Sequence, residues 1–462
     1  MIYRFIPLLG VVLVAGCAAT ASNYQRPDVP SVNIWQSQQS GKVAPLGWQQ
    51  VFPDAALQQL VKTALDHNRD LSIATLNVMA YEAQYRIQRA ALLPTVDMGA
   101  GGTRQRTPAR FSTSGQATTA SQYSLLLGTT AYELDMFGRV RGLERQALEK
   151  YLAEVQNQRT ARLSLVANVV NAYLTWVADR EQLQLAKTNL AIEQSNIDLV
   201  NLRFQEGVAS DLERSQAEGA LQDVLVAVAQ YQRLAEQDRN ALTQLLGTPL
   251  PTGFQPADTL NALKVGQVLA GLPSSVLDQR PDLLAAEHQL QAANANITVA
   301  KAALFPSIRL TASGGALSPD LEGLFDAGTG TWLFSPQISV PLFNGGALRR
   351  QVDVTEVQQK IAVAQYESAV QNAFTEVANA LNAIDGYQKQ QIHQTGRLAA
   401  NKQYFTTADL RYRSGIDSML PRLDAQRSYV GSQQAMINTR LALLQSRVDL
   451  YRALGGGWSE QK

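Results

Sequence analysis

The stretch LERQALEKYLAEVQNQRTARLSLVANVVNAYLTWVADREQLQLAKTNLAIEQSNIDLVNLRFQE, residues 143–206, runs for 64 residues without a glycine or a proline. These residues are the strongest helix breakers, and most globular helices end within about 20 residues. A helix of this length would extend roughly 95 Å, about three times the core of a bilayer. Charges recur throughout, so it is not a membrane span. Its apolar residues return at helical spacing, so one face must pack on other helices. Alone, the stretch fits a solvated coiled coil.

The composition restricts the possible partners of these helices. The chain has 462 residues, of which 17% are charged, below the roughly 25% typical of soluble domains. Long solvated helices usually carry more charge, so many helix faces are expected to contact protein. The net charge is +1, and nothing indicates a nucleic-acid partner. After the N-terminus no run of about 18 apolar residues occurs, so no helical membrane span is expected.

The N-terminus has the features of an export signal. Arg4 precedes an apolar run over 5–15, which is too short for a membrane helix. Val14-Ala15-Gly16-Cys17 resembles the lipobox of bacterial lipoproteins, which implies removal of the signal peptide 1–16 and a covalent lipid on Cys17. Cys17 is the only cysteine, and lipidation explains an otherwise unpaired thiol. In such signals the following Ala18-Ala19 implies the outer membrane. No other cofactor is expected.

Glycine and proline residues, which interrupt helices and strands, divide the remaining chain into segments. Residues 17–60 are rich in proline, serine and glutamine and are expected to form an extended arm, and 248–275 a linker. Asp211 can cap the helix that follows Gly207. The first structural repeat, 61–247, is expected to contain a helix, strands 94–104 and 123–137, a long helix 140–205 and a helix 211–246. The second, 276–455, is expected to contain a helix, strands 306–316 and 332–342, a long helix 346–414 and a helix 418–454, before a tail 456–462.

The two repeats match residue by residue at a nearly constant offset, which indicates an internal duplication. The matching segments are Ala90-Ala91-Leu92-Leu93-Pro94 with Ala302-Ala303-Leu304-Phe305-Pro306, Leu202-Arg203-Phe204 with Leu410-Arg411-Tyr412, and Leu246-Gly247 with Leu454-Gly455.

The expected strands alternate between apolar and polar residues. Val96, Met98 and Ala100 share one face, and Asp97 and Gly99 the other. A length of about 10 residues with one apolar face suits a transmembrane β-strand. Lipid cannot satisfy open strand edges, so spanning strands must form a closed barrel, which needs at least about eight strands. Several chains would therefore have to share one barrel. A soluble sheet covered on one side remains the alternative.

At this point the chain resembles an outer-membrane factor of the TolC/OprM type, in its lipoprotein branch. The resemblance rests on an ordered set of motifs: the lipobox at Cys17, the strand starts at Pro94 and Pro306, Tyr132-Glu133-Leu134-Asp135-Met136-Phe137-Gly138-Arg139, Val340-Pro341-Leu342-Phe343-Asn344-Gly345-Gly346, the turns at Gly207 and Gly415, and Leu423-Asp424-Ala425-Gln426.

The resemblance implies an α+β membrane protein of the TolC-like fold. In that fold a homotrimer forms a 12-stranded transmembrane β-barrel continued by a 12-helix periplasmic α-barrel. It implies a passive exit duct in the outer membrane, in contact with lipid, for a tripartite efflux pump. The partners would be a periplasmic adaptor (membrane fusion) protein and an inner-membrane transporter of the resistance-nodulation-division (RND) type. The exported compounds would be drugs or other toxic molecules, selected by the transporter rather than by this chain.

The same resemblance assigns roles to two turns. Gly207, Val208 and Ala209, and likewise Gly415 and Ile416, would contact the adaptor. The alternative is that these glycines only permit a tight turn.

Near these turns the resemblance places a periplasmic gate. Asp424 would form an acidic ring that narrows the bore, and Tyr412 and Glu213 would belong to a lock between helices. The chain departs from some relatives here, because Pro421 stands where another acidic ring can occur and Asp417 where a lock arginine can occur. Arg411 or Arg413 is therefore expected to take part in the lock. Asp424 could instead be a solvated residue or a partner of Arg422 or Arg427.

Nothing in the sequence indicates an enzyme or a metal site. His67, His288 and His393 are scattered, without a nucleophile or ligand at a suitable spacing, and no phosphate-binding loop occurs. Two alternatives to the efflux duct stay open: a conduit for type I protein secretion, and a lipid-anchored coiled-coil scaffold without a pore. The scaffold predicts almost no β-structure.

Overall fold

The computed structural model describes residue 26 and residues 47–266 and 279–456. Of the described residues, 77–155 and 285–367 form one compact unit, unit 1, and 47–76, 156–266, 279–284 and 368–456 form another, unit 2. Residues of helices α4 (Arg69–Ala90), α5 (Arg139–Gln205), α7 (Pro281–Ala302) and α8 (Ala347–Arg413) belong to both units. Several expected segments lie outside the described residues: the signal peptide 1–16, Cys17, most of the arm before residue 47, residues 267–275 of the linker and residues 457–462 of the tail.

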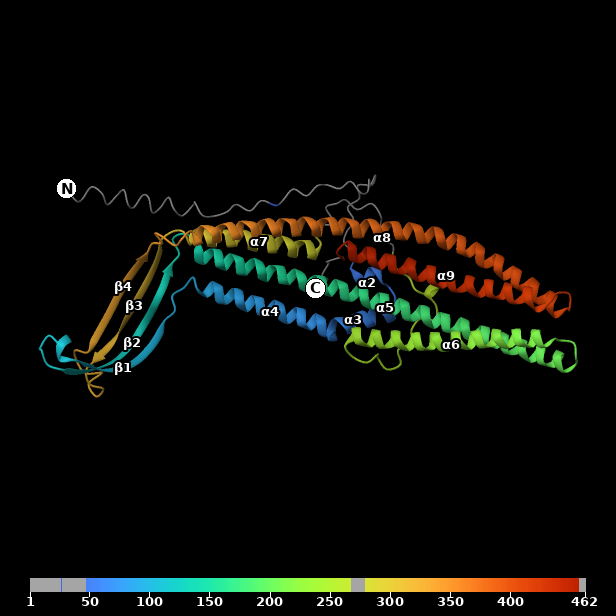
Figure 1. Ribbon diagram of the computed structural model, residues 1–462, viewed down its shortest axis with the longest axis horizontal. Helices are drawn as coiled ribbons and strands as arrows, with labels where there is room; N and C mark the ends of the chain where they lie inside the picture. Colours follow the sequence, from blue (N-terminus) through green and yellow to red (C-terminus); the bar gives the residue numbers. More distant parts are fainter. Residues whose placement is uncertain (1–25, 27–46, 267–278, 457–462) are drawn as a thin grey trace. The chain divides into compact units, whose positions relative to one another are not determined.

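Unit 1 contains an antiparallel sheet in the order β1-β2-β3-β4 (Figure 1). Its strands are β1 (Asp97–Thr107), β2 (Thr118–Leu134), β3 (Ser307–Ser318) and β4 (Gly330–Ser339), and a short 3-10 helix, η2 (Ala109–Phe111), lies between β1 and β2. The central β2–β3 ladder joins the two sequence repeats. Within the described residues, β1 and β4 each have one edge without a partner strand.

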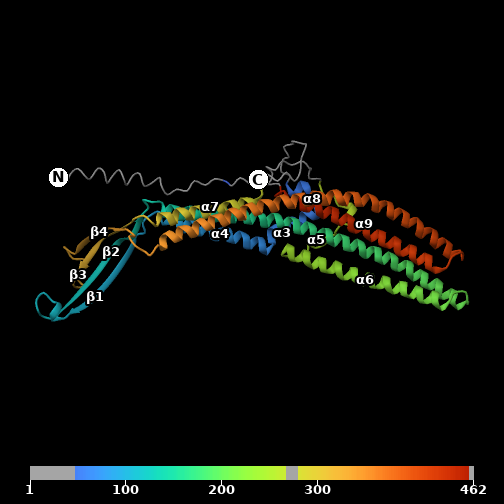
Figure 2. The ribbon, with the colours of Figure 1, turned by 45° about the horizontal axis from the view of Figure 1, so that its top comes forward.

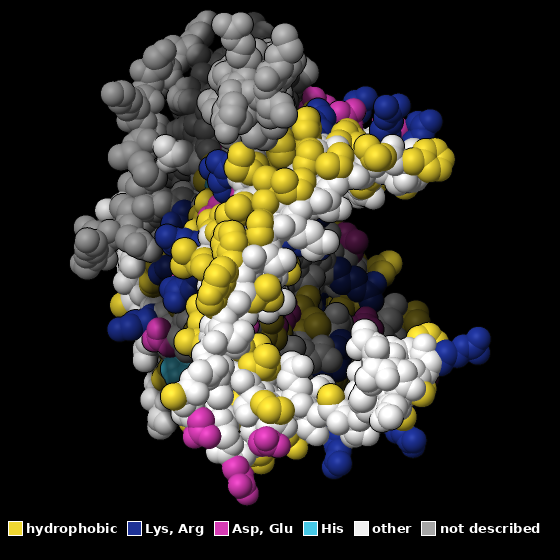
Figure 3. Space-filling model, turned by 90° about the vertical axis from the view of Figure 1, so that its left-hand side faces the viewer, with side chains coloured by type: hydrophobic (Ala, Val, Ile, Leu, Met, Phe, Trp, Pro, Cys, Tyr) yellow, Lys and Arg dark blue, Asp and Glu magenta, His cyan; other side chains and the backbone are white. Residues whose placement is uncertain are grey.

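The register gives the sheet one apolar and one polar face, as the alternation predicted. Met98, Leu127, Gly314 and Trp332 form one row across the four strands, and Met98 and Trp332 are 72% and 81% exposed. Figure 3 shows a band of hydrophobic side chains along the sheet. Glu133, Arg309 and Gln337 form a row on the opposite face. Such exposure of large apolar side chains marks a surface that is covered by lipid or protein.

The strand limits differ from the expected ones because the ladders extend them. Thr118–Gln122 looked like loop by composition but pairs with Thr103–Thr107, so β1 ends later and β2 begins earlier than expected. β4 ends at Ser339 rather than at 342, because Ser339 pairs with the first residue of β3. A bulge between Thr129 and Tyr132, where Ala131 has a φ of 56°, was not foreseen.

The expectation of an extended arm up to residue 60 was wrong for its last part. Helices α2 (Trp48–Val51) and α3 (Ala55–His67) form there. The Asp54 side chain caps α3 by accepting a hydrogen bond from Leu57 N at 2.8 Å. Asn68 separates α3 from α4: its side chain accepts from Leu71 N and donates to Leu245 O, both at 2.9 Å.

Unit 2 contains two antiparallel helical hairpins. α5 turns into α6 (Asp211–Leu246), and α8 turns into α9 (Met419–Ala453), as both views of the ribbon show (Figures 1 and 2). The core gathers residues of α3, α5, α6 and α9, including the fully buried Tyr173. The described part of the linker packs here, since Tyr173 Oη accepts from Ala257 N at 3.0 Å and 3-10 helix η3 (Leu260–Ala262) begins at a backbone N–H bound by Glu181. Among the described helices, none is both long and apolar enough to cross a membrane.

Candidate functional site

The two hairpin turns of unit 2 have the same backbone. Gly207 and Gly415 have φ values of +73° and +72°. Val208 N donates to Arg203 O at 2.8 Å, and Ile416 N donates to Arg411 O at 2.9 Å. This bond across six residues, with glycine in the left-handed region, is a Schellman helix end. A side chain at either glycine would meet open space, so it is the positive φ that favours glycine.

The predicted turn residues differ in their accessibility. Val208 and Ile416 are exposed, as docking would require, whereas Ala209 is buried in an apolar cluster between the hairpins. The other buried members of this cluster are Ile197, Val200, Ala217, Leu221, Tyr412, Met419 and Leu423.

The helices after the turns begin differently. Ser210, rather than Asp211 as expected, caps α6 by accepting a hydrogen bond from Glu213 N at 3.2 Å. Ser418 has the equivalent place before α9 but accepts no such bond. Pro421 stands where α6 has Glu213, and proline has no N–H to donate. The duplication is therefore asymmetric at this point, which leaves Glu213 as the acidic residue without a counterpart.

Tyr412 and Glu213 meet between the two hairpins. Tyr412 Oη donates to Glu213 Oε1 at 2.7 Å, although the residues are 199 positions apart. Tyr412 is 2% exposed, and the guanidinium groups of Arg203 and Arg422 lie 5.4 and 5.8 Å from its ring centre. Burial, followed by the hydrogen bond to Glu213, raises the pKa of Tyr412 to about 12. The phenol therefore remains a donor at physiological pH.

Next to Tyr412 lies a buried arginine that sequence reasoning did not place in the site. Arg422 Nε contacts Asp409 Oδ1 at 2.8 Å, and Arg422 Nη1 lies 3.9 Å from Glu193 Oε2. The side chains of Arg422 and Glu193 are each 1% exposed. Glu193 also accepts from Asn196 Nδ2 at 3.3 Å. A charge removed from water to this extent is costly unless it is paired, so these groups depend on one another.

The first repeat shows the same arrangement in an exposed form. Arg214, which lies 208 positions before Arg422, stacks on Phe204 at 4.4 Å, and Phe204 is the counterpart of Tyr412. Arg214 pairs with Asp211, and both side chains are largely exposed. The duplicated chain thus contains one buried and one solvated copy of an arginine on an aromatic ring.

The remaining predicted gate residues make separate contacts. Arg411 binds Asp417 through two hydrogen bonds of 2.6 and 2.9 Å, which lower the pKa of Asp417. Arg413 pairs with Asp409 at 2.8 Å. Asp424 is exposed and accepts from Tyr404 Oη at 3.1 Å. The structure therefore brings together Tyr412 and Glu213, but places the other four elsewhere around the α8–α9 turn.

The expected alternative partners of Asp424 pair with other carboxylates. Arg422 pairs as described, and Arg427 Nη2 lies 3.8 Å from Asp223 Oδ2. Asp424 thus stays available to a neighbouring surface, and its role in a ring remains a prediction.

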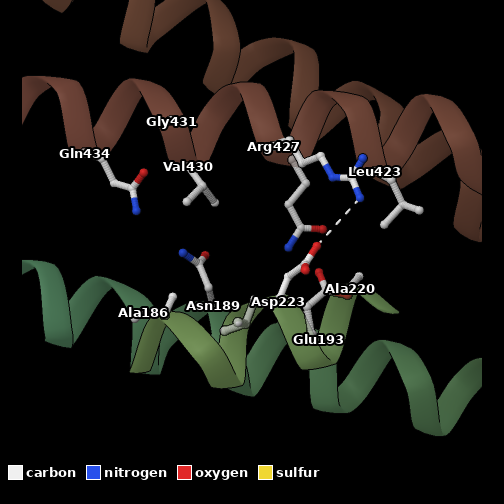
Figure 4. Close-up of a pocket in the computed structure, with 13 residues that line it drawn as sticks. Ala186, Asn189, Glu193, Ala220, Asp223, Leu423, Arg427, Val430, Gly431 and Gln434 are labelled. Atoms are coloured by element: carbon white, nitrogen blue, oxygen red, sulfur yellow. Dashed lines mark ion pairs between the residues drawn. The ribbon is translucent and has the colours of Figure 1, made fainter. Parts of the chain in front are cut away.

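A cavity of about 230 Å³ separates α9 from α5 and α6 beside the buried arginine. Figure 4 shows Asp223 and Arg427 paired across it, with Asn189 and Gln434 pointing toward one another. Glu193 lines one end. Helices that border a cavity lose packing contacts on that side, so α9 can shift here at a lower cost than in a close-packed core.

A sequence signal for Glu193 existed. Glu193 stands four residues before Ile197 and seven before Val200, on the apolar stripe of α5. A carboxylate at a stripe position predicts a buried partner. The partner itself, Arg422, has no local signal because it lies on another helix, 229 positions away.

A second polar contact joins α5 and α6 away from the turns. Asp179 and Asp238 share a hydrogen bond, and burial followed by the charge of Asp179 raises the pKa of Asp238 to about 7. A folded pKa above the roughly 3.9 of an unfolded aspartate means that the folded chain holds the proton more tightly. This contribution to stability is complete below about pH 4 and is lost as the pH rises to about 7.

Replacing Asp238 with asparagine should therefore flatten the dependence of stability on pH. We expect the wild-type melting temperature to fall between pH 5 and pH 8 by more than that of the variant, by an amount equivalent to about 1 kcal/mol after allowing for solvent. Scanning fluorimetry at pH 5, 6, 7 and 8 measures this. Asp385→Asn, which removes an exposed partner of Lys389, is the control. Equal slopes for wild type and Asp238→Asn would refute this assignment.

The described parts of the chain contain no cluster of three or more metal-binding side chains. His288 contacts the buried Glu149 at 2.8 Å, and His67 contacts Thr63 O at 3.1 Å. These histidines are accounted for by structural contacts.

The sheet and the hairpins together define a class of protein. One duplicated chain combines a sheet, which has one apolar and one polar face and two unpaired edges among the described residues, with very long helical hairpins that end in glycine turns. This is the architecture of a TolC-like outer membrane channel.

Comparison with known proteins supports this class. Residues 60–248 and 272–456, one segment from each repeat, match the model of the outer membrane efflux protein family. The chain is 48% identical to the probable efflux pump outer membrane protein TtgC of Pseudomonas putida, over 97% of this chain and 94% of that protein.

Solved structures give the same result. A membrane protein from Pseudomonas aeruginosa matches with a TM-score of 0.88 at 38% identity, over 96% of this chain and 98% of that one. The open state of the Neisseria gonorrhoeae MtrE outer membrane channel matches with a TM-score of 0.86 at 38% identity, over 95% and 98%. The chain belongs to the outer membrane efflux protein family, and the predicted TolC-like fold is confirmed.

Proposed function

We propose that three copies of this chain form the outer-membrane exit duct of a tripartite efflux pump. The observation that carries the proposal is the sheet: one face exposes Met98, Trp332 and Phe334, and both edges are unpaired within the described residues. Four strands are too few to close a barrel, whereas three copies supply twelve. Joining β1 of one copy to β4 of the next pairs both edges. This is necessary in a membrane because lipid cannot form hydrogen bonds with unpaired backbone groups.

Anchoring and partners follow from the same proposal. The lipid on Cys17 would hold the chain at the membrane surface, and the sheet would embed it. Val208 and Ile416 would present small exposed turns to a periplasmic adaptor protein, which connects the duct to an inner-membrane RND transporter. Relatives are named as efflux pump components for solvents and antibiotics, which supports a similar range of cargo. The duct is passive and non-enzymatic, so its partners supply the energy.

Of the two alternatives, the scaffold without a pore predicted almost no β-structure, and the sheet contradicts it. Type I protein secretion would use the same architecture, but no observation on this chain favours it over efflux.

Planar-bilayer recording on the detergent-purified protein tests the proposed duct. We expect discrete conductance steps from a particle whose mass, measured by light scattering, is that of three copies. A monomer, or a trimer that gives no steps, would contradict the proposal.

The same recording tests Asp424. Three copies of an exposed carboxylate around a narrow bore attract cations and restrict flow. Asp424→Ala should raise the conductance about twofold and lower the preference for cations. Asp424→Asn separates the two effects, because it removes the charge but keeps the size, and should change mainly the selectivity. Unchanged conductance and selectivity in both variants would remove Asp424 from the gate.

A further inference from the structure

The β1–β2 hairpin carries positive charge without any compensating carboxylate. Between Asp97 and Glu133 the sequence contains no aspartate, glutamate or lysine, but it contains Arg104, Arg106 and Arg110. All three are exposed. Within the described ranges none of them makes an ion pair. Such a concentration of unpaired arginine creates a positive surface that attracts anions.

The register places two of these arginines on the apolar face of the sheet. Arg104 and Arg106 have the same strand parity as Met98, whose partner on β2 is Leu127. Beyond the pair of Gly102 with Tyr123 the face changes character: Arg104 lies opposite Ser121, and Arg106 opposite Thr119. Arginine and hydroxyl groups thus replace leucine and methionine along the same surface.

The position of this change matches the edge of a bilayer. On β2 the apolar face runs from Leu134 to Tyr123, roughly 37 Å along the strand at about 3.4 Å per residue. A tilt of about 40° reduces this to a height of roughly 28 Å, close to the ~25 Å apolar band of outer-membrane barrels. Tyr123 then lies at the level of the aromatic girdle, and Arg104 one step further out, at the lipid head groups.

β1 runs away from α4 toward the β1–β2 connection, so the arginines lie at the end of the strand remote from its helix. If the helices are periplasmic, as in the proposed function on which this inference rests, that end faces the outside of the cell. There the lipid head groups of the outer leaflet carry phosphate.

We propose that Arg104 and Arg106, with the hydroxyl groups of Thr119 and Ser121, form a binding site for the phosphate groups of the outer-leaflet glycolipid. Side chains two residues apart on one face are about 7 Å apart, so both guanidinium groups reach one phosphate. Planar guanidinium groups bind phosphate oxygens in pairs, and the hydroxyls donate the further bonds that phosphate accepts. The leucines beside them contact the acyl chains of the same lipid.

A competing occupant is the β3–β4 connection of a second copy, which carries Asp320, Glu322 and Asp326. The outward direction of the two arginines favours lipid, because a neighbouring strand lies in the plane of the sheet rather than above its face.

Binding of diphosphorylated lipid A to the purified full-length protein in detergent, followed by native mass spectrometry at low ionic strength, tests the site. We expect the affinity of the double variant R104Q/R106Q to be about 30-fold lower than that of wild type, equivalent to about 2 kcal/mol at 1.4 kcal/mol per tenfold change. R104K/R106K should retain most of the affinity. R104Q/Q105R/R106Q returns a charge at the same height but on the polar face, and should not restore binding.

The probes separate the possible occupants. Dephosphorylated lipid A should bind wild type and R104Q/R106Q equally, and millimolar inorganic phosphate alone should not displace lipid A. Displacement of lipid A by inorganic phosphate would overturn the proposal that the ligand is a lipid and would indicate a free anion instead. Equal binding of diphosphorylated lipid A to wild type and R104Q/R106Q would overturn the site. Loss of the trimer in both R104Q/R106Q and D320N/E322Q/D326N would also overturn it, because the arginines would then bind the β3–β4 connection of a second copy. Channel conductance should be the same in both proteins, so failure of the duct and failure of this site are distinguishable.

Discussion

Replacing Arg422 with methionine is expected to destabilise the ends of the helical hairpins by about 3–5 kcal/mol, the largest effect of any single change considered. Methionine fills the space but leaves Glu193, which is almost fully buried, without a countercharge. Asp409 keeps Arg413 as a partner, so the loss concentrates on Glu193. Hydrogen exchange of the amides in 193–221 and 409–430 measures the effect locally.

The duplication supplies a matched control for this experiment. Arg214→Met removes the equivalent arginine of the first repeat, whose ion pair is exposed, and should cost about 1 kcal/mol or less. The double variant Arg422→Met with Glu193→Gln should recover much of the lost protection, because no buried charge then remains unpaired. Equal protection in Arg422→Met and Arg214→Met would show that burial of Arg422 is of no consequence.

Replacing Tyr412 with phenylalanine is expected to open the duct. The change removes a 2.7 Å hydrogen bond to a carboxylate between α8 and α6 and leaves the ring in place. A hydrogen bond to a charged group contributes about 1.5–3 kcal/mol, so the population of separated hairpins should rise roughly 10- to 100-fold. Planar-bilayer recording should show longer and larger conducting states.

Tyr387→Phe, also on α8 but away from the turns, is the matched control and should leave the recordings unchanged. Glu213→Gln keeps a weaker acceptor for the phenol and should give an intermediate phenotype. Because the pKa of Tyr412 is raised to about 12, the wild-type contact should persist at neutral and mildly alkaline pH. If Tyr412→Phe gave the same recordings as wild type, the contact between Tyr412 and Glu213 would not act as a lock.

Local pattern was enough for much of the fold. The period-2 alternation at Val96–Ala100 predicted a two-faced strand, and the register confirms that Met98 and Trp332 share a face. Glycines 207 and 415, at equal places in the two repeats, predicted the turns, which share a single geometry. These features depend on side chains that are close in sequence, so they could be predicted from a single sequence.

Features that depend on distant partners were not predictable. Thr118–Gln122 becomes strand only because β1 provides a ladder, and α2 forms within the expected extended arm, where Val51 reaches the core of unit 2. The contact of Tyr412 with Glu213 was anticipated from the family resemblance, whereas the pairing of Arg422 with Glu193 links helices that no local pattern relates.

The proposed duct requires that one copy of this chain is too few to complete the sheet of unit 1. Light scattering in detergent tests this through the mass of the Cys17→Ser variant, which lacks the proposed site of lipid attachment. We expect this variant to stay in the membrane fraction and, once extracted, to have the mass of three copies. A water-soluble monomer with β1–β4 folded would contradict it.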